Sequence, residues 1–269
     1  MTSVNEMVRA QRSRGWWSGF GNLLAKEGRE WWETSRWLIQ AAIWLLVLNG
    51  FIALLLWVFP GMTQNGQPVL EGDPIEHAVS VLFSLGAPGL AIGVIVLMQD
   101  VVLEEKQTGT AAWILSKPVT REAFILAKLV AHSVGVVVVM IALPGIVAYG
   151  EIALAGSGWV APQNFLAGLG ILALHSLFYL ALTLLMGVIA SSRSQVLGVS
   201  LSVLLGGMIL IEFVSMAGAF TPWSLPGLGV LIVLGEPLPD WGGFAIVMNG
   251  LWTIGFIAAA MWAFKHHDV

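Results

Sequence analysis

The chain is organised around residues 104–128, which read EEKQTGTAAWILSKPVTREAFILAK and form the one richly charged segment between its apolar runs. Of the 269 residues, 57% are hydrophobic and only 10% are charged, and the mean hydropathy is +0.85. This balance is typical of a polytopic membrane protein and not of a soluble domain. The chain has no cysteine, which excludes disulfides, thiolate catalysis and cysteine-ligated metals. The charged segment is therefore expected to be a water-exposed link between two membrane helices.

Glycine and proline divide this link into short pieces. Gly109 weakens helical continuity, and the apolar stretch after it has room for about one and a half turns of helix. Trp113 and Ile114 are expected to face the lipid surface from that helix. Pro118 ends it, and Thr120 is a good N-cap for the helix that follows. The sequence therefore predicts a short transverse helix between two membrane spans.

Six apolar runs are long enough to cross a bilayer. They cover about residues 38–59, 77–103, 123–149, 165–190, 195–216 and 244–264. Within residues 217–243, a seventh apolar piece at 228–235 is too short to cross and is bracketed by Pro-rich turns, so we expect a re-entrant or interfacial segment there. Residues 191–194, Ser-Ser-Arg-Ser, are expected to form a tight polar turn. The fold class predicted is an all-α integral membrane protein with six transmembrane helices.

An amphipathic helix is predicted ahead of the first span, from Trp16 to about Arg36. Its apolar face carries Trp17, Phe20, Leu24, Gly28 and Trp31. An aromatic-rich helix with basic residues is expected to lie in the plane of the membrane interface. A helix docked on a protein partner is the alternative.

The charges predict the orientation. With six spans, all 12 Lys and Arg residues fall at one side of the membrane, in the N-terminal region, the 104–128 segment, the turn after span four and the C-terminus. The opposite loops carry only acidic residues, namely Glu71, Asp73, Glu76, Glu151, Glu236 and Asp240. By the positive-inside rule, both termini are cytoplasmic and the protein is a multi-pass protein of the cell membrane.

Signatures of catalysis are missing from the sequence. There is no Gly-Lys dipeptide for a phosphate-binding loop, no His-Glu-x-x-His pair and no Gly-x-Ser-x-Gly elbow, so we predict no catalytic residue and no metal site. His175 and Glu212 are ionisable groups within spans and are possible intramembrane polar sites of a proton or cation relay. A neutral histidine bonded to a neighbouring helix and a glutamate near outer water are the favoured interpretation. Asn49 and Asn249 are interpreted as interhelical hydrogen-bonding residues.

The charged segment resembles that of the ABC-two-type permeases, the membrane subunits of exporter-class ATP-binding-cassette transporters. The residues that match the pattern are Glu105, Gly109, Thr110, Pro118, Val119, Thr120, Arg121 and Lys128. Gln107 departs from it, because the family often has a charged residue there. The six spans, the interfacial helix, the polar turn and the partial re-entry agree with the same architecture.

The resemblance implies a permease subunit without its own ATPase site, transport in the direction of export, and a coupling helix after Gly109 that fits a groove of a separate ATPase. The implied ATPase-coupling residues are Glu105, Gly109, Thr110, Trp113, Pro118, Arg121 and Lys128. Two ATPase subunits are the implied partners, together with a second permease copy or a paralogue and the lipid bilayer, but no nucleic acid. ATP and Mg are expected on the partner ATPase, and this chain is expected to bind no cofactor.

Two other functions stay open. One is a self-sufficient secondary carrier or channel that uses His175 and Glu212, and the other is a membrane scaffold. The expected organisation is a tail and interfacial helix at 1–37, a permease domain at 38–264 and a cytoplasmic end at 265–269. Within the permease domain, the residues 104–122 are called the coupling segment below.

Overall fold

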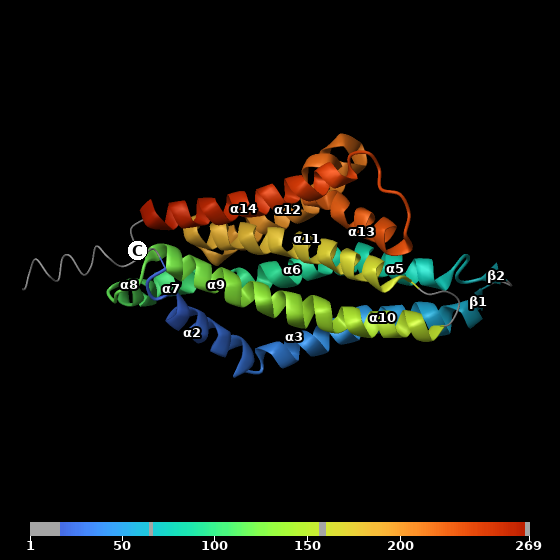
Figure 1. Ribbon diagram of the computed structural model, residues 1–269, viewed down its shortest axis with the longest axis horizontal. Coiled ribbons are helices and arrows are strands. Elements are labelled where there is room, and N and C mark those ends of the chain that lie inside the picture. Colours follow the sequence, from blue (N-terminus) through green and yellow to red (C-terminus); the bar gives the residue numbers. More distant parts are fainter. Residues whose placement is uncertain (1–16, 65–66, 156–159, 267–269) are drawn as a thin grey trace, which may run out of the picture.

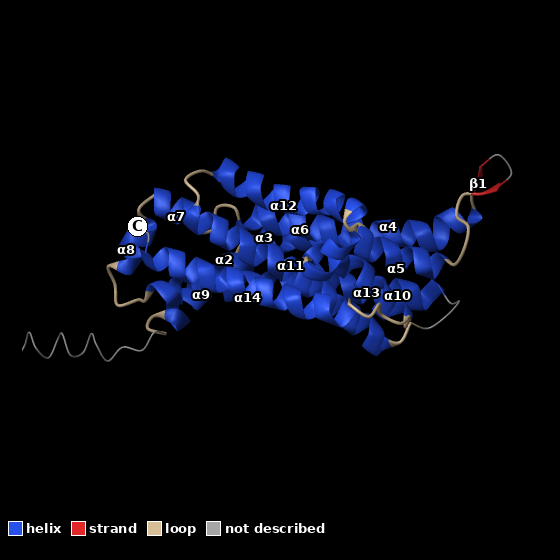
Figure 2. Ribbon diagram, turned by 90° about the horizontal axis from the view of Figure 1, so that it is seen from above, coloured by secondary structure: helices blue, strands red, loops and turns tan. Residues whose placement is uncertain are grey.

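The computed structural model describes residues 17–64, 67–155 and 160–266. Within these residues, six helical runs are long and apolar enough to cross a membrane, and they lie along one common axis (Figures 1 and 2). The runs are Arg36–Gly61, Pro74–Gln107, Arg121–Ala155, Pro162–Ile189, Arg193–Phe213 and Gly242–His266. The prediction of an all-α integral membrane protein is confirmed. The predicted tail at 1–15 lies outside the described residues.

The first three runs are built from several pieces, and the last three are single helices. The first run consists of α3 (Arg36–Trp44), the π-helical turn η1 (Leu45–Asn49), α4 (Gly50–Ala53), the π-helical turn η2 (Leu54–Val58) and the 3₁₀ turn η3 (Phe59–Gly61). The second consists of α5 (Pro74–Ser84), α6 (Gly86–Met98) and α7 (Leu103–Gln107). The third consists of α9 (Arg121–Gly135), the π-helical turn η4 (Val136–Ala142) and α10 (Leu143–Ala155). The others are α11 (Pro162–Ile189), α12 (Arg193–Phe213) and α14 (Gly242–His266).

Prolines account for two of these interruptions. Pro88 has no N–H to donate to the carbonyl of Ser84 and its ring crowds that carbonyl, and the second run breaks at Leu85 between α5 and α6. Pro144 acts in the same way on the carbonyl of Met140, and the wider turn η4, which contains Met140, ends two residues before this proline. Both spans therefore cross the bilayer as jointed helices.

The α11 helix is the centre of the bundle and packs against α14, α13 and α6. By contrast, α12 and α14 bury only a small part of their surface and expose large apolar side chains, as lipid-facing helices do. The phenyl ring of Phe83 is fully buried where α5 meets two glycines, Gly168 of α11 and Gly229 of α13. These glycines allow the close approach, because a Cβ at either position would collide with that ring.

The short helix α13 (Leu225–Leu234) occupies the segment for which a re-entrant turn is predicted. It follows the 3₁₀ turns η5 (Ser215–Phe220) and η6 (Pro222–Ser224), and it ends at Gly235, whose φ of 75° suits a glycine C-cap. Ten residues of helix extend about 15 Å, which is half of a bilayer core. α13 packs on α11 and α5 inside the bundle (Figure 1).

Opposite ends of the bundle differ in structure. At one end lie α7, α8 (Thr110–Leu115) and the end of the described chain, and at the other lies the hairpin β1 (Thr63–Gln64) and β2 (Gln67–Pro68) (Figures 1 and 2). In this antiparallel hairpin Thr63 pairs with Pro68 and Gln64 with Gln67.

Some boundaries differ from the sequence-based expectation. The third run continues to Ala155 instead of ending at Tyr149, which places Glu151 in a helix and not in a loop. The polar turn at 191–194 is shorter than expected: Ser192 is the N-cap of α12, its hydroxyl accepts from the N–H of Gln195, and Arg193 is already helical.

Candidate functional site

The coupling segment folds as two short helices joined by a tight turn. α7 ends at Gln107, and Gly109 has a φ of 74°, in the left-handed region that favours glycine, so the chain reverses direction before α8. After α8, Thr120 caps α9 by accepting a hydrogen bond from the N–H of Ala123 at 3.2 Å. The expected short helix and N-cap are both present.

The outer surface of α8 presents one tryptophan. Trp113 is 62% exposed, and the ammonium of Lys117 lies 3.4 Å from the centre of one of its rings. Ile114 does not face the lipid as expected, because it is buried with Ala111 against the bundle. The expectation for Ile114 was wrong for a geometric reason: α8 is docked on its own chain along that side. Trp113 and Lys117 form what we call the tip of the coupling segment.

Four charged side chains meet beneath the coupling segment, and we call them the ionic cluster: Lys26 and Glu27 of α2 (Phe20–Trp32), Glu105 of α7 and Lys128 of α9. Lys128 Nζ donates to Glu27 Oε1 at 2.9 Å and lies 3.0 Å from Glu105 Oε2. Lys26 Nζ donates to Glu105 Oε1 at 2.6 Å. Glu27 and Lys128 are each only 2% exposed. The cluster therefore joins three elements that are far apart in sequence.

Electrostatics in the ionic cluster favour the charged forms. Burial alone would raise the pKa of Glu27, but the charge and hydrogen bond of Lys128, with the charge of Lys26, hold it below its ordinary value of 4.5. Burial alone would lower the pKa of Lys26, but the hydrogen bond to Glu105 and the charges of Glu27 and Glu105 raise it above 10.5. Both groups remain ionised at neutral pH.

A polar cleft of about 530 Å³ opens beside the ionic cluster. Its wall includes Glu30, Arg36, Asp100 and Glu104 as well as the buried ring of His132. His132 Nδ1 is 2.9 Å from the carbonyl oxygen of Lys128, and its ring meets the ring of Trp31 edge to face. No group of three or more metal-ligating side chains is found among the residues that the structure describes.

A second set of contacts joins residues 100–107 to the end of α11, the turn after it and the start of α12. Arg193 Nε donates to Asp100 Oδ1 at 2.7 Å, and Lys106 donates to the carbonyl of Val188. Gln107 Nε2 donates to the carbonyl of Ser191 at 3.1 Å. Gln107, at the position where the chain departs from the pattern of the resembled family, thus uses an amide hydrogen bond to reach the same turn.

Arg121, near the C-terminal end of the coupling segment, binds the end of the last helix, α14. Arg121 Nη1 donates to the carbonyls of Phe264 and Lys265, both at 3.0 Å, and so satisfies two carbonyls at the C-terminus of α14. On the other side, Ser18 Oγ donates to the carbonyl of Pro118 at 2.9 Å, and the N–H of Thr120 donates to the carbonyl of Ser18 at 3.1 Å. The segment is therefore attached to the chain before α2 and to the end of α14.

The amphipathic helix is present as α2, but its buried face is not the expected one. Trp17 is exposed and Phe20 and Leu24 are partly buried, whereas Trp31 is 0% exposed and packs on Gly135 of α9 and not at a lipid surface. The stripe that meets the bundle is Leu23, Glu27 and Trp31, with a spacing of four residues. Sequence reasoning missed Glu27, and the signal that could have found it is this spacing.

Within the membrane-spanning part, His175 and Glu212 line the same pocket, of about 200 Å³. His175 is 2% exposed and its Nδ1 has no hydrogen-bond partner. The expected bond from this histidine to a neighbouring helix is therefore not made at Nδ1. Asn49 does join two helical runs, since its Nδ2 donates to the carbonyl of Pro144 in α10 at 3.0 Å. Asn249 of α14 does not join two helices as expected, because its Nδ2 donates at 3.0 Å to the carbonyl of Thr221, which lies between η5 and η6.

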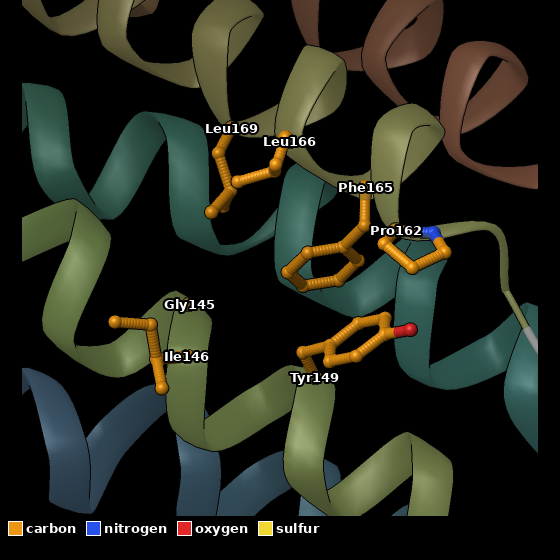
Figure 3. A pocket seen from close by; sticks show the side chains of 7 residues that line it. All are labelled: Gly145, Ile146, Tyr149, Pro162, Phe165, Leu166 and Leu169. Carbon is orange, nitrogen blue, oxygen red and sulfur yellow. The ribbon is translucent and has the colours of Figure 1, made fainter.

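Another pocket is almost wholly apolar. It measures about 220 Å³ and lies between α10 and α11, where the rings of Tyr149 and Phe165 face each other and Leu169 closes one side (Figure 3). Ile146 and Leu166 on its rim are largely exposed, and the Tyr149 hydroxyl donates to the carbonyl of Val160 at 3.2 Å. This hollow on a lipid-facing side offers no free polar group to select a ligand.

The fold and the site define a class: a multi-pass membrane protein whose spans are joined at one end by a firmly anchored helix with an exposed tip. The family model described as ABC-2 family transporter protein matches residues 34–226, which is most of the chain. The chain therefore belongs to the ABC-2 transporter family, and the match includes the coupling segment and the first five spans. No curated protein matches the chain.

Proposed function

We propose that this protein is the permease subunit of an ATP-binding-cassette exporter and that its coupling segment receives the movement of a separate ATPase. The observation that carries the proposal is the combination of an exposed tip with an anchored base. Trp113 protrudes from α8, while Glu105 and Lys128 join the base to α2 and Arg121 joins it to α14. A push on the tip would therefore move α2, α7, α9 and α14 together with α8.

The assembly proposed contains two ATPase subunits and a second permease, with ATP and Mg²⁺ on the ATPase chains. A face of α12 with Gly198, Ser202 and Gly206 supports pairing outside the chain, because a Cβ at either glycine would meet nothing within 4 Å. In contrast, Gly89 and Gly93 of α6 pack against Trp44 within the chain. The proposed location is the cell membrane, with both termini and the tip in the cytoplasm.

The test is co-purification. Trp113→Ala should weaken binding of the endogenous ATPase at least tenfold, because an exposed aromatic at the centre of an interface typically contributes about 2 kcal/mol. Trp241→Ala, which changes an exposed tryptophan at the other end of the bundle, is the matched control and should leave the ATPase bound. Equal recovery of ATPase with both variants would count against the coupling role of α8.

The alternative of a self-sufficient carrier has one observation in its favour, since His175 and Glu212 share one pocket. The two functions separate in proteoliposomes that contain only this chain. An exporter subunit should move no solute uphill without its ATPase and ATP. Uphill uptake driven by an ion gradient, and lost in a His175→Gln/Glu212→Gln variant, would favour the carrier.

A further inference from the structure

We propose that the pocket between α5, α6, α11, α12 and η6 is a binding site for a small organic ammonium with an apolar body. If the protein is an exporter, as proposed above, this ligand is a transported solute, and that part of the inference rests on the proposed function. The wall of the pocket contains His175, Glu212 and Trp223. The residues that complete the wall are Ser84, Pro88, Leu204, Met208, Ile211 and Pro226.

The first argument is an unsatisfied polar atom. His175 is buried in the wall of the pocket and its Nδ1 has no partner, although a buried polar atom without a hydrogen bond is costly and rare. An unsatisfied buried nitrogen in the wall of a pocket indicates that a ligand completes the hydrogen bonding of His175.

The second argument is the break in the second span. The pocket lies at the joint between α5 and α6, where Pro88 cannot donate to the carbonyl of Ser84. In transporters, broken helices with freed carbonyls characteristically surround substrate or ion sites in the membrane. This observation is independent of His175, because it concerns the backbone of the second span and not a side chain.

The chemistry of the wall selects the ligand. Glu212 is its one charged side chain, no Lys or Arg contributes to it, and the indole N–H of Trp223 is already donated to the carbonyl of Val203 at 3.1 Å. A negative charge and the unpaired Nδ1 of His175 therefore line the pocket together with apolar and aromatic groups, which suits a cationic donor and disfavours an anion. A volume of about 200 Å³ exceeds the roughly 150 Å³ that holds a benzene molecule, so an aryl methylamine fits.

The test uses the full chain in lipid nanodiscs and three fluorinated probes of similar size: 4-fluorobenzylamine, 4-fluorobenzyl alcohol and 4-fluorobenzoate. Ligand-observed fluorine NMR titration, with empty nanodiscs as the blank, gives the Kd of each. The amine, which is protonated at neutral pH, should bind at least tenfold more tightly than the alcohol, and the benzoate should not bind. Equal affinities for the amine and the alcohol would overturn the proposal.

Variants locate the binding. Glu212→Gln removes the negative charge of an exposed side chain and keeps its shape, so it should weaken amine binding at least tenfold. His175→Phe removes the unpaired ring nitrogen and should weaken amine binding several-fold. Because a change at buried His175 can disturb folding, Met208→Trp provides a second route: it fills the pocket from its exposed rim and should abolish binding with the charge retained. Glu236→Gln, an exposed acid outside the pocket, is the matched control and should change the Kd less than twofold.

Wild-type affinity in both Glu212→Gln and Met208→Trp would overturn the site. This outcome is independent of the ATPase partner, because the titration needs no nucleotide. Conversely, if the ATPase did not co-purify with the wild-type chain, the proposed exporter role would fail while the amine titration remained decisive for the pocket.

Discussion

Lys128 is the residue on which the ionic cluster depends, because it is the buried cation between Glu27 and Glu105. Its removal leaves Glu27 buried without its main partner, and breaking a buried ion pair typically costs about 3–5 kcal/mol. We therefore expect Lys128→Met to lower the free energy of unfolding by that amount in a denaturant titration in mixed micelles. The double variant Glu27→Gln/Lys128→Met should recover much of the loss.

The matched control for this prediction is Glu104→Gln. Glu104 is the neighbour of Glu105 in the sequence, its side chain is exposed, and it forms no ion pair with any residue that the structure describes. This variant should change the free energy of unfolding by less than about 0.5 kcal/mol. If Lys128→Met were no less stable than Glu104→Gln, the cluster would not hold α2 to α9.

The pH dependence of stability follows from Glu27. Because its pKa is lowered by folding, its contribution is fully present above its ordinary pKa of 4.5 and is lost as the pH falls through the lowered value. The difference in melting temperature between wild type and Glu27→Gln should thus be large near neutral pH and shrink below about pH 4. Differential scanning fluorimetry across this range tests it, and a constant difference would contradict the assignment of Glu27 as the ionised partner.

At the residue scale, the sequence was informative where a local motif existed. Gly109, Thr120 and the short helix between them were predictable from backbone preferences, and the structure has them. Glu27 was not found, because an acidic residue beside Lys26 on an amphipathic helix is ordinarily a solvated one. Its burial depends on Lys128, which lies 101 positions further along the chain.

At the scale of elements, the docking of α2 on α9 depends on one close approach. A Cβ at Gly135 would fall well inside van der Waals contact with the indole of Trp31. Gly135→Val should therefore displace α2 and cost about 1–3 kcal/mol, measured as a loss of thermal stability in detergent. Gly150→Val is the matched control in the same span, because a Cβ at Gly150 meets nothing within 4 Å. Equal effects of the two changes would indicate a general cost of valine in this span.

Element boundaries and joints were only partly predictable. Pro88 falls within the apolar run 77–103 of the sequence, and the break beside it has a direct cause in the missing N–H. The π-helical turns in spans one and three were not expected, since a change of helix type leaves hydropathy unchanged. The burial of Trp31 was missed for a similar reason: an apolar helix face shows that something covers it, but not whether this is lipid or protein.

For the whole molecule, orientation is the testable property. The chain has no cysteine, so single cysteines can be introduced without a prior cysteine-free background. Cysteines at Glu71 and Glu236 should react with a membrane-impermeant maleimide added to intact cells, whereas one at Lys117 should react only after permeabilisation. The reverse labelling pattern would invert the topology and place the tip outside the cell.

The six spans and their class were predictable because hydropathy and charge are summed over many residues. The position of α13 was not, because it depends on Gly168, Gly229 and Phe83 meeting from three separate elements. The shared pocket of His175 and Glu212 has the same origin: the two residues lie on different helices, and only the packed bundle shows that one hollow joins them.

The contact between Arg121 and the last turn of α14 has a practical consequence for handling the protein. A purification tag or fluorescent protein fused after Val269 begins only a few residues beyond Lys265, beside the surface that we expect the ATPase to cover. Such a fusion would block binding of the ATPase without preventing the permease from folding. The purified protein would then be inactive because its ATPase is missing, and not because the permease itself is defective. An epitope inserted at the hairpin between Gln64 and Gln67, at the opposite pole, avoids this obstruction.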